Sequence, residues 1–376
     1  MKYKIKKIIK FLAVFAVCYL IFLSCGFFAV RYGITNTSVA VDANNDKFQK
    51  NADIIKSIAR VEAASDSNIG FIEKIKNENF CKINAIGEIS KLNAERIFTT
   101  YQKTQSDSLS SKMILAVVLR LKDNVAFQDK ILNCENSSLR VAYASEVAKM
   151  DFSQNDGQNI FTWANEAEWN AIKNGVLKDK EAINRAGNLV GIEPRIIVAS
   201  LIVEQLRLFH SQRELFKKFF EPLKILGNST KISLGVMGIK EATAIDTERH
   251  LKDPDSPYYL GAQSEHLLDL NSSDQVQERF AHLTDDKNHY YSYLYGAVYL
   301  KEILSQWKSA GYDIKYRPEI IGTLFNVGFP QSKPNSAPKV GGSKISISDG
   351  EYSFGSLAYE FYYSGELAED FPYLIN

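Results

Sequence analysis

Residues 191–209, Gly-Ile-Glu-Pro-Arg-Ile-Ile-Val-Ala-Ser-Leu-Ile-Val-Glu-Gln-Leu-Arg-Leu-Phe, are the stretch around which the chain is organised. Pro194 presets φ for a first helical turn, and Glu193 places a negative charge at the positive end of the helix dipole. Nearly every later position is apolar, and a helix that is apolar on all sides is normally buried in a larger domain. The stretch therefore predicts the central helix of a helical globule.

Glu204 is an acidic residue in the interior of this predicted helix. Burial disfavours the charged form of a carboxyl group, so such a glutamate must be paired, neutralised or held at the wall of a cleft. A glutamate kept protonated by its surroundings is a general acid. Two interpretations stay open on this helix alone: a catalytic acid, or a structural glutamate satisfied by an arginine or a backbone donor.

The amino terminus predicts a membrane segment within residues 1–31. Five lysines occupy the first ten positions, and residues 11–30 carry no charge. Twenty residues in a helix rise roughly 30 Å, enough to span a bilayer. The lysines should remain on the cytoplasmic side and send the rest of the chain across the membrane. A cleaved export signal, with Ser24-Cys25 ending an imperfect lipoprotein-type box, is the alternative, and all these options export the chain.

The net charge bears on which kinds of partner the protein binds, and the cysteine content bears on whether it contains a disulfide. Leaving the six basic residues of 1–31 out of the total of 45 gives 39 basic against 44 acidic residues beyond the anchor, a formal charge of −5. That balance argues against a nucleic-acid partner. Cys81 and Cys134 are an even pair in an exported, oxidising setting, which favours a disulfide, with two buried thiols as the alternative. No cysteine or histidine spacing predicts a metal site, and we expect no cofactor.

Apolar periodicity predicts an all-α chain with four parts. After the anchor, residues 32–50 are small and polar and are expected to be a linker. Residues 51–150 show helical spacing and are expected to form an α-helical accessory region, which could be a spacer, a docking surface for a cell-envelope protein or part of the same globule. Residues 151–376 carry a second helical series, and the Pro/Ser/Gly-rich stretch 330–349 is expected to be a loop.

Five short motifs occur in order in this last part. They are Gly191-Ile-Glu-Pro194 leading to Glu204, Ser233-Leu-Gly-Val-Met-Gly-Ile239, Gly296-Ala-Val-Tyr-Leu300, Leu324-Phe-Asn-Val-Gly328 and Ala358-Tyr359. Together they resemble the lytic transglycosylase and goose-type lysozyme family over roughly residues 160–370. That family has a catalytic glutamate at this interval after a Gly-Val-Asp-Pro stretch, then Gly-Leu-Met-Gln-Ile, Gly-x-x-Tyr-Leu and Ala-Tyr-Asn-Ala-Gly motifs, and a tyrosine in the last helix.

The resemblance implies a lysozyme-like catalytic domain that cleaves the β-1,4 bond between N-acetylmuramic acid and N-acetylglucosamine in peptidoglycan. It implies Glu204 as the catalytic residue and a substrate-binding set of Ser233, Met237, Phe325, Asn326 and Tyr359. The expected location is a bacterial cytoplasmic membrane, spanned once, with the catalytic domain on the periplasmic or outer face. Some of the residues in these motifs also have a structural alternative. Met237 could simply fill space in the core, and Asn326 could cap a helix. The tyrosines of 290–299 could form one side of a helix that packs in the core.

The sequence departs from the family pattern at three positions. Gln205 follows the glutamate where the family has serine, Gly238 stands in place of glutamine, and Phe325 stands in place of tyrosine. A single acid suffices for cleavage where the N-acetyl group of the substrate assists, the exception to the two-carboxylate rule. We therefore expect a lytic transglycosylase that leaves 1,6-anhydro ends; a goose-type hydrolase and a non-catalytic peptidoglycan-binding or scaffold module are the alternatives.

Overall fold

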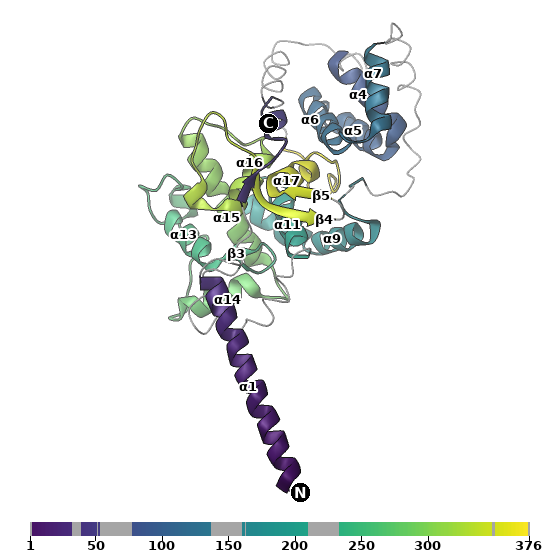
Figure 1. Ribbon diagram of the computed structural model, residues 1–376. Helices are drawn as coiled ribbons and strands as arrows, with labels where there is room; N and C mark the ends of the chain where they lie inside the picture. The colour runs from purple at the N-terminus through teal and green to yellow at the C-terminus, as the bar shows by residue number, and fades with distance from the viewer. Residues whose placement is uncertain are drawn as a thin grey trace.

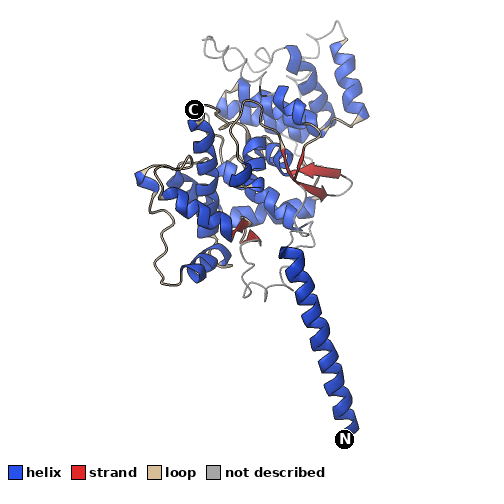
Figure 2. Ribbon diagram, turned by 60° about the vertical axis from the view of Figure 1, so that its left-hand side comes forward, coloured by secondary structure: helices blue, strands red, loops and turns tan. Residues whose placement is uncertain are grey.

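The computed structural model describes residues 2–31, 39–50, 52, 77–136, 160–161, 163–209, 233–347 and 350–374. The architecture is mostly helical, which confirms the predicted all-α class, with one small three-stranded sheet and one short hairpin added (Figures 1 and 2).

Helix α1, Lys2–Arg31, stands out from the remaining elements over most of its length (Figure 1). Its window Ile9–Gly26 has a mean hydropathy of 2.2 and is only 6% buried. The helix is therefore long and apolar enough to cross a membrane, and the protein supplies little cover for its apolar side chains.

The expected linker ends earlier than the sequence suggested. Strand β1, Val39–Val41, pairs antiparallel with β4, Gly341–Ile347, and β4 pairs in turn with β5, Gly350–Ser353. The Asp42 amide donates to the Val340 carbonyl at 2.8 Å, and Phe48 is 4% exposed in the core. Residues 39–50 thus belong to the globular body, because they supply an edge strand and a core side chain.

The same sheet corrects the expectation of a loop over 330–349. Residues 341–347 form a strand because Ser-Lys-Ile-Ser-Ile alternates polar and apolar positions, and Ile345 and Ile347 point into the core while Lys344 faces solvent. The 3-10 turn η4, Phe329–Gln331, precedes this strand.

Within the described residues, the accessory region comprises α4 (Asn77–Ile89), α5 (Lys91–Thr104), α6 (Asp107–Arg120) and α7 (Val125–Glu135). Ser106 and Asn124 cap α6 and α7 by accepting a hydrogen bond from a backbone amide three residues on, which satisfies otherwise unpaired donors. A disulfide between Cys81 and Cys134, with a Cα–Cα distance of 5.4 Å, joins α4 to α7.

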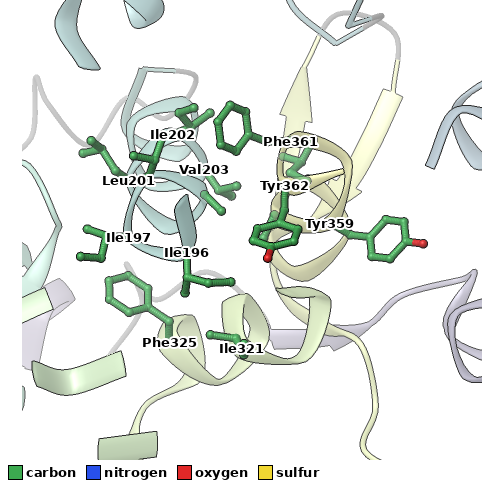
Figure 3. Close-up of a cluster of buried hydrophobic side chains, with 14 of the residues drawn as sticks. Ile196, Ile197, Leu201, Ile202, Val203, Ile321, Phe325, Tyr359, Phe361 and Tyr362 are labelled. Atoms are coloured by element: carbon green, nitrogen blue, oxygen red, sulfur yellow. The ribbon is translucent and has the colours of Figure 1, made fainter. Parts of the chain in front are cut away.

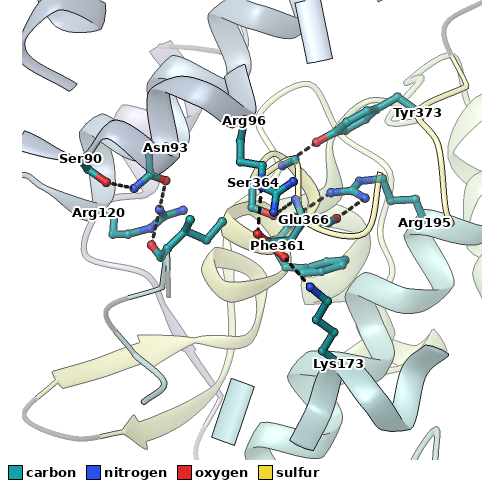
Figure 4. Close-up of polar contacts among 12 residues, drawn as sticks. Ser90, Asn93, Arg96, Arg120, Lys173, Arg195, Phe361, Ser364, Glu366 and Tyr373 are labelled. Atoms are coloured by element: carbon teal, nitrogen blue, oxygen red, sulfur yellow. Dashed lines mark hydrogen bonds and ion pairs between the residues drawn. The ribbon is translucent and has the colours of Figure 1, made fainter. Parts of the chain in front are cut away.

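Buried ion pairs fix this region to the rest of the protein. The Arg120 guanidinium on α6 pairs with Glu360 on α17 (Phe354–Tyr362) at 3.4 Å, and the Trp163 indole donates to the same carboxylate at 2.8 Å. Arg96 on α5 reaches Glu366, just beyond α17, at 3.2 Å (Figure 4). Of the three options left open by the sequence, these contacts support one globule.

Helix α11, Pro194–Phe209, lies in the middle of the core, as predicted. Ile197, Ile202 and Val203 are fully buried, and Figure 3 shows the helix facing α16 (Pro318–Val327) and α17. Burying each such side chain contributes about 1.5–3 kcal/mol. The middle of α11 is therefore anchored in the core.

The remaining helices are α9 (Glu166–Lys178), α10 (Lys180–Val190), α13 (Glu241–Leu251), α14 (Gln275–Thr284) and α15 (Tyr290–Ser309), with the 3-10 turn η3 (Ala262–Ser264). Of these, α9, α10 and α15 contact α11, and α13, α14 and α15 contact a hairpin. Asn165 and Glu168 form a capping box that starts α9, and Gly191, at φ +69°, ends α10. The hairpin consists of β2, Ser233–Leu234, and β3, Ile239–Lys240.

Candidate active site

Glu204 lies two-thirds of the way along α11 and is 2% exposed. Both of its carboxylate oxygens accept hydrogen bonds from Arg207 one turn later: Nε donates to Oε2 at 2.9 Å, and Nη2 donates to Oε1. The Arg207 side chain is itself 6% exposed. Glu204 therefore faces a buried guanidinium that bonds both of its oxygens, and its surroundings are not the purely apolar ones that the sequence suggested.

The hairpin β2–β3 closes onto this carboxylate through Gly238. A Cβ added at Gly238 would lie 1.9 Å from Glu204 Oε1 and 2.3 Å from its Cδ, and the residue has φ +61°. Only glycine meets both demands, because it favours the left-handed region and leaves room for the carboxyl group. The departure from the family's glutamine therefore has a structural cause: Glu204 occupies the space in which a side chain would start.

Two neighbouring contacts fix the hairpin to the helices. The Gln205 side-chain amide donates to the Val236 carbonyl at 2.5 Å. Met237 is fully buried, and its Cε would lie 2.8 Å from a Cβ added at Gly296 on α15. Met237 is thus packed against the glycine of the third motif, in the core position that the sequence left as an alternative to a sugar-facing wall.

Helix α15 also connects the hairpin to α16. The Tyr299 hydroxyl, one turn after Gly296, donates to the backbone carbonyl of Phe325 at 3.1 Å, and the two rings are 5.2 Å apart. Phe325 is 7% exposed. The Asn326 carboxamide oxygen accepts from the Ser343 amide of β4 at 2.7 Å. Four of the five motifs are therefore linked by direct contacts, from Glu204 through the hairpin and α15 to α16.

Tyr359 is not part of this chain of contacts. Its side chain points away from α11, whereas Phe361 and Tyr362 point toward it (Figure 3). The Tyr359 ring packs edge-on against Phe48 at 5.1 Å, and its hydroxyl donates to the Lys112 carbonyl of the accessory region at 3.4 Å. The substrate role implied by the resemblance is thus unsupported for Tyr359. Ser233 lies in β2 opposite Lys240, and its side chain is outside the described part of the chain.

The tyrosines of α15 pack mainly in the core. Tyr293 donates to Asp179 at 2.6 Å, Tyr295 donates to Glu248 at 2.5 Å, and burial raises the pKa of both hydroxyls. Tyr291 differs, because it is 36% exposed and stacks on His282 with ring centroids 3.7 Å apart. The buried-stripe alternative therefore holds for Tyr293, Tyr295 and Tyr299, and a platform for sugars made of these three is excluded.

Three buried polar groups were missed or misplaced by sequence reasoning. Glu193, expected only to complement the helix dipole, accepts the Tyr362 hydroxyl at 2.9 Å, and burial raises its pKa. His250, which the sequence did not single out, is 7% exposed, with Nδ1 3.5 Å from the buried Glu302. Arg207 could have been found, since Glu-x-x-Arg spacing places the two side chains on one helix face.

Among the described residues, no group of three or more histidine, cysteine or acidic side chains could hold a metal ion. The arrangement supplies one buried carboxylate, a bidentate arginine and a close-packed glycine turn. Chemically, it can exchange a proton at Glu204 only if something replaces the guanidinium, because Arg207 occupies both oxygens.

No family model, curated protein or solved structure matches the chain in comparisons with known proteins. The likeness to lytic transglycosylases therefore depends on the five motifs and on how the fold arranges them.

Proposed function

We propose that the protein is a membrane-anchored lytic transglycosylase that cleaves peptidoglycan glycan strands with Glu204 as its single acid and base. One observation carries the proposal: the glycine turn of the second motif packs directly on the carboxylate of the first, although Glu204 and Gly238 are far apart in the chain. Separate motifs that meet at one buried acid are typical of an active site.

The proposed reaction has two proton transfers. Glu204 protonates the glycosidic oxygen as the bond to C1 of N-acetylmuramic acid breaks, with the N-acetyl group of the sugar stabilising the positive centre. The Glu204 carboxylate then takes the proton of the sugar's C6 hydroxyl while O6 bonds to C1. The 1,6-anhydro ring closes, and the acid has regained its proton.

Arg207 sets a condition on this reaction. In the arrangement described above, the Arg207 guanidinium bonds both carboxyl oxygens of Glu204. The bound strand therefore has to displace the guanidinium before either oxygen of Glu204 can exchange a proton with the glycosidic bond. Met237 and Phe325 support the site from the core, because Met237 packs the hairpin against α15 and Phe325 packs α16 against α15, while Asn326 bonds α16 to the sheet.

The location of the proposed activity is outside the cytoplasmic membrane. Helix α1 supplies the span, and the lysines at its start favour a cytoplasmic amino terminus. The Cys81–Cys134 disulfide supports the same side, since such bonds persist in oxidising compartments.

A second candidate function is a non-catalytic module that holds a glycan strand. The Glu204–Arg207 ion pair favours it, because a glutamate bonded at both oxygens is a common structural element of a buried helix face. In that case the ion pair remains intact when the strand binds, and the turn at Gly238 serves only packing.

The test uses full-length protein in nanodiscs, incubated with purified peptidoglycan between about pH 4 and 8, the range in which a carboxyl acid operates. Mass spectrometry of soluble products distinguishes anhydro ends from the reducing ends of a hydrolase. We expect anhydro products from the wild type and none from Glu204→Gln, with unchanged thermal stability. Glu302→Gln, at a fully buried glutamate on α15, is the matched control and should retain cleavage above about pH 6.5, where His250 stays neutral in the unfolded chain as well. Strand binding without product from the wild type would replace the proposal with the second candidate.

A further inference from the structure

We infer that Gln205 is a positioning residue for the proposed reaction, because its side chain holds the glycine turn against the Glu204 carboxyl group. The glycine turn is defined as residues 235–238, between strands β2 and β3. The inference rests on the proposed function and adds to it a residue that acts through this turn and not on the sugar itself.

The glycine turn has a closing hydrogen bond that leaves its central peptide unfixed. The Gly238 amide donates to the Gly235 carbonyl at 3.2 Å, and the two glycines have φ +61° and +62°. The peptide between Val236 and Met237 takes no part in this bond. Such a central peptide can point to either side of a turn, which is the difference between type I and type II. Groups outside the turn therefore have to set its orientation.

Two helices bond this central peptide, one at each end. Its carbonyl, that of Val236, accepts from the Gln205 side-chain amide on α11 at 2.5 Å. Its N–H, that of Met237, donates to the Ser292 hydroxyl on α15 at 3.4 Å. N–H···O bonds in proteins are most often 2.9–3.0 Å long, so the first bond is short and the second is long. Gln205 therefore contributes more than Ser292 to the orientation of the peptide.

Gln205 and Glu204 contact the same turn from adjacent positions of α11. Glu204 Oε1 would lie 1.9 Å from a Cβ added at Gly238, and Gln205 bonds Val236 two residues earlier. A displacement of the turn would therefore change the surface that packs on the carboxyl group. Displacements of roughly 1 Å at a reacting group can cost a large factor in rate. Gln205 thus affects Glu204 through the turn.

The bond from Gln205 is independent of the ion pair that the proposed reaction has to open. Within the described part of the chain, the Arg207 guanidinium bonds only the two oxygens of Glu204. The Gln205 amide and the Val236 carbonyl share no atom with that pair. The turn can therefore stay in place while the guanidinium leaves, and Glu204 keeps one fixed neighbour during both proton transfers.

Two of the three departures from the family pattern meet at this turn. Gln205 stands where the family has serine, and Gly238 stands where it has glutamine. Gly238 has no side chain with which to bond the helix. In this chain the side chain that connects helix and turn starts on the helix, which gives the glutamine at position 205 a structural cause.

The experiment compares three full-length proteins in nanodiscs: the wild type, Gln205→Met and Gln128→Met. Methionine keeps the length of the side chain and removes its donor. Gln128 on α7 is the matched control, because its side-chain amide also donates to a backbone carbonyl, that of Lys122, at 3.2 Å in the accessory region. The measurements are hydrogen exchange of residues 233–240, and kcat and KM for cleavage of purified glycan strands.

In Gln205→Met we expect exchange over 233–240 to be about tenfold faster and kcat about tenfold lower, the factor that the loss of one good hydrogen bond gives. KM should stay within about twofold, and Gln128→Met should match the wild type in every readout. Unchanged exchange in Gln205→Met would overturn the inference. A tenfold higher KM at unchanged kcat would also overturn it, because Gln205 would then bind substrate directly.

Gln205→Glu supplies a readout that does not depend on cleavage. A protonated carboxyl group can donate to the Val236 carbonyl, whereas a carboxylate cannot. The exchange rate over 233–240, divided by that of the wild type at the same pH, should therefore rise between about pH 4 and 7. A ratio that does not change with pH would contradict the bond. Equal kcat in the wild type and Gln205→Met would overturn this inference alone, whereas no product from the wild type would overturn the proposed function as well.

Discussion

Replacing Gly238 by alanine tests the contact that defines the candidate site. The new Cβ would lie 1.9 Å from Glu204 Oε1, and ordinary contacts begin at 3.4 Å, so the carboxylate must move by roughly 1.5 Å. A left-handed φ costs a non-glycine residue about 1–2 kcal/mol. Overpacking adds about 1–3 kcal/mol, and we expect a total loss of about 2–5 kcal/mol in the free energy of unfolding.

Gly311→Ala is the matched control, because Gly311 has φ +86° and nothing within 4 Å of an added Cβ. Gly311→Ala should lower the free energy of unfolding only by the cost of a left-handed φ, about 1–2 kcal/mol. The assay is urea unfolding of the four proteins of a cycle with Glu204→Ala, since removing the carboxylate should make Gly238→Ala as mild as the control. Equal losses for Gly238→Ala and Gly311→Ala, or an additive cycle, would refute the close packing of hairpin on carboxylate.

Three further outcomes follow from buried polar groups and the disulfide. Arg195→Met should cost about 3–5 kcal/mol in chemical unfolding, because its fully buried guanidinium donates to four backbone carbonyls at the carboxyl end of the fold; a loss below that of Gly311→Ala would contradict this role. Reducing Cys81–Cys134, which closes a separation of 53 residues, should destabilise the accessory helices by roughly 4 kcal/mol, measured by hydrogen exchange of α4 and α7 with and without reductant. Burial lowers the pKa of His250 from 6.5 to about 4, so the unfolded chain takes up a proton first as the pH falls from 6.5 to 4, and the folded protein loses stability. Burial raises the pKa of Glu302, and this shift stabilises the folded protein as the pH falls. Glu302→Gln should therefore reveal an acid-dependent loss of about 2–3 kcal/mol in the free energy of unfolding, and adding His250→Phe should remove that loss.

The central helix could be predicted because its signals are local. Pro194 and the continuous apolar positions define α11 without reference to any other part of the chain. The structure confirms this helix. The pairing of Cys81 with Cys134 needed only cysteine counting and the inferred compartment.

The sheet could not be predicted in the same way because its strands are short and far apart. Three residues of β1 carry no periodic signal, and they form a strand only because β4, three hundred positions later, offers a free edge. The Ser-Lys-Ile-Ser-Ile alternation of β4 was visible but was outweighed by its proline- and glycine-rich surroundings.

Side-chain partners inside the core were the least predictable part of the site. Tyr359 occupies the last helix as the resemblance required, yet its direction depends on Phe48 and the accessory region, which the family motifs do not include. Whether Glu204 faces an apolar pocket or a cation depended on one rotamer of Arg207. Periodicity places a residue on a helix face but does not determine which neighbour its charged end contacts.

Soluble products of peptidoglycan incubated with the full-length protein and with Glu204→Gln, identified by mass spectrometry, test the central claim most directly. We predict 1,6-anhydro-muropeptides from the wild type and none from the variant. Identical product profiles from the two proteins, or no products from either while both bind the strand, would contradict the role of Glu204 as the acid that breaks the glycosidic bond.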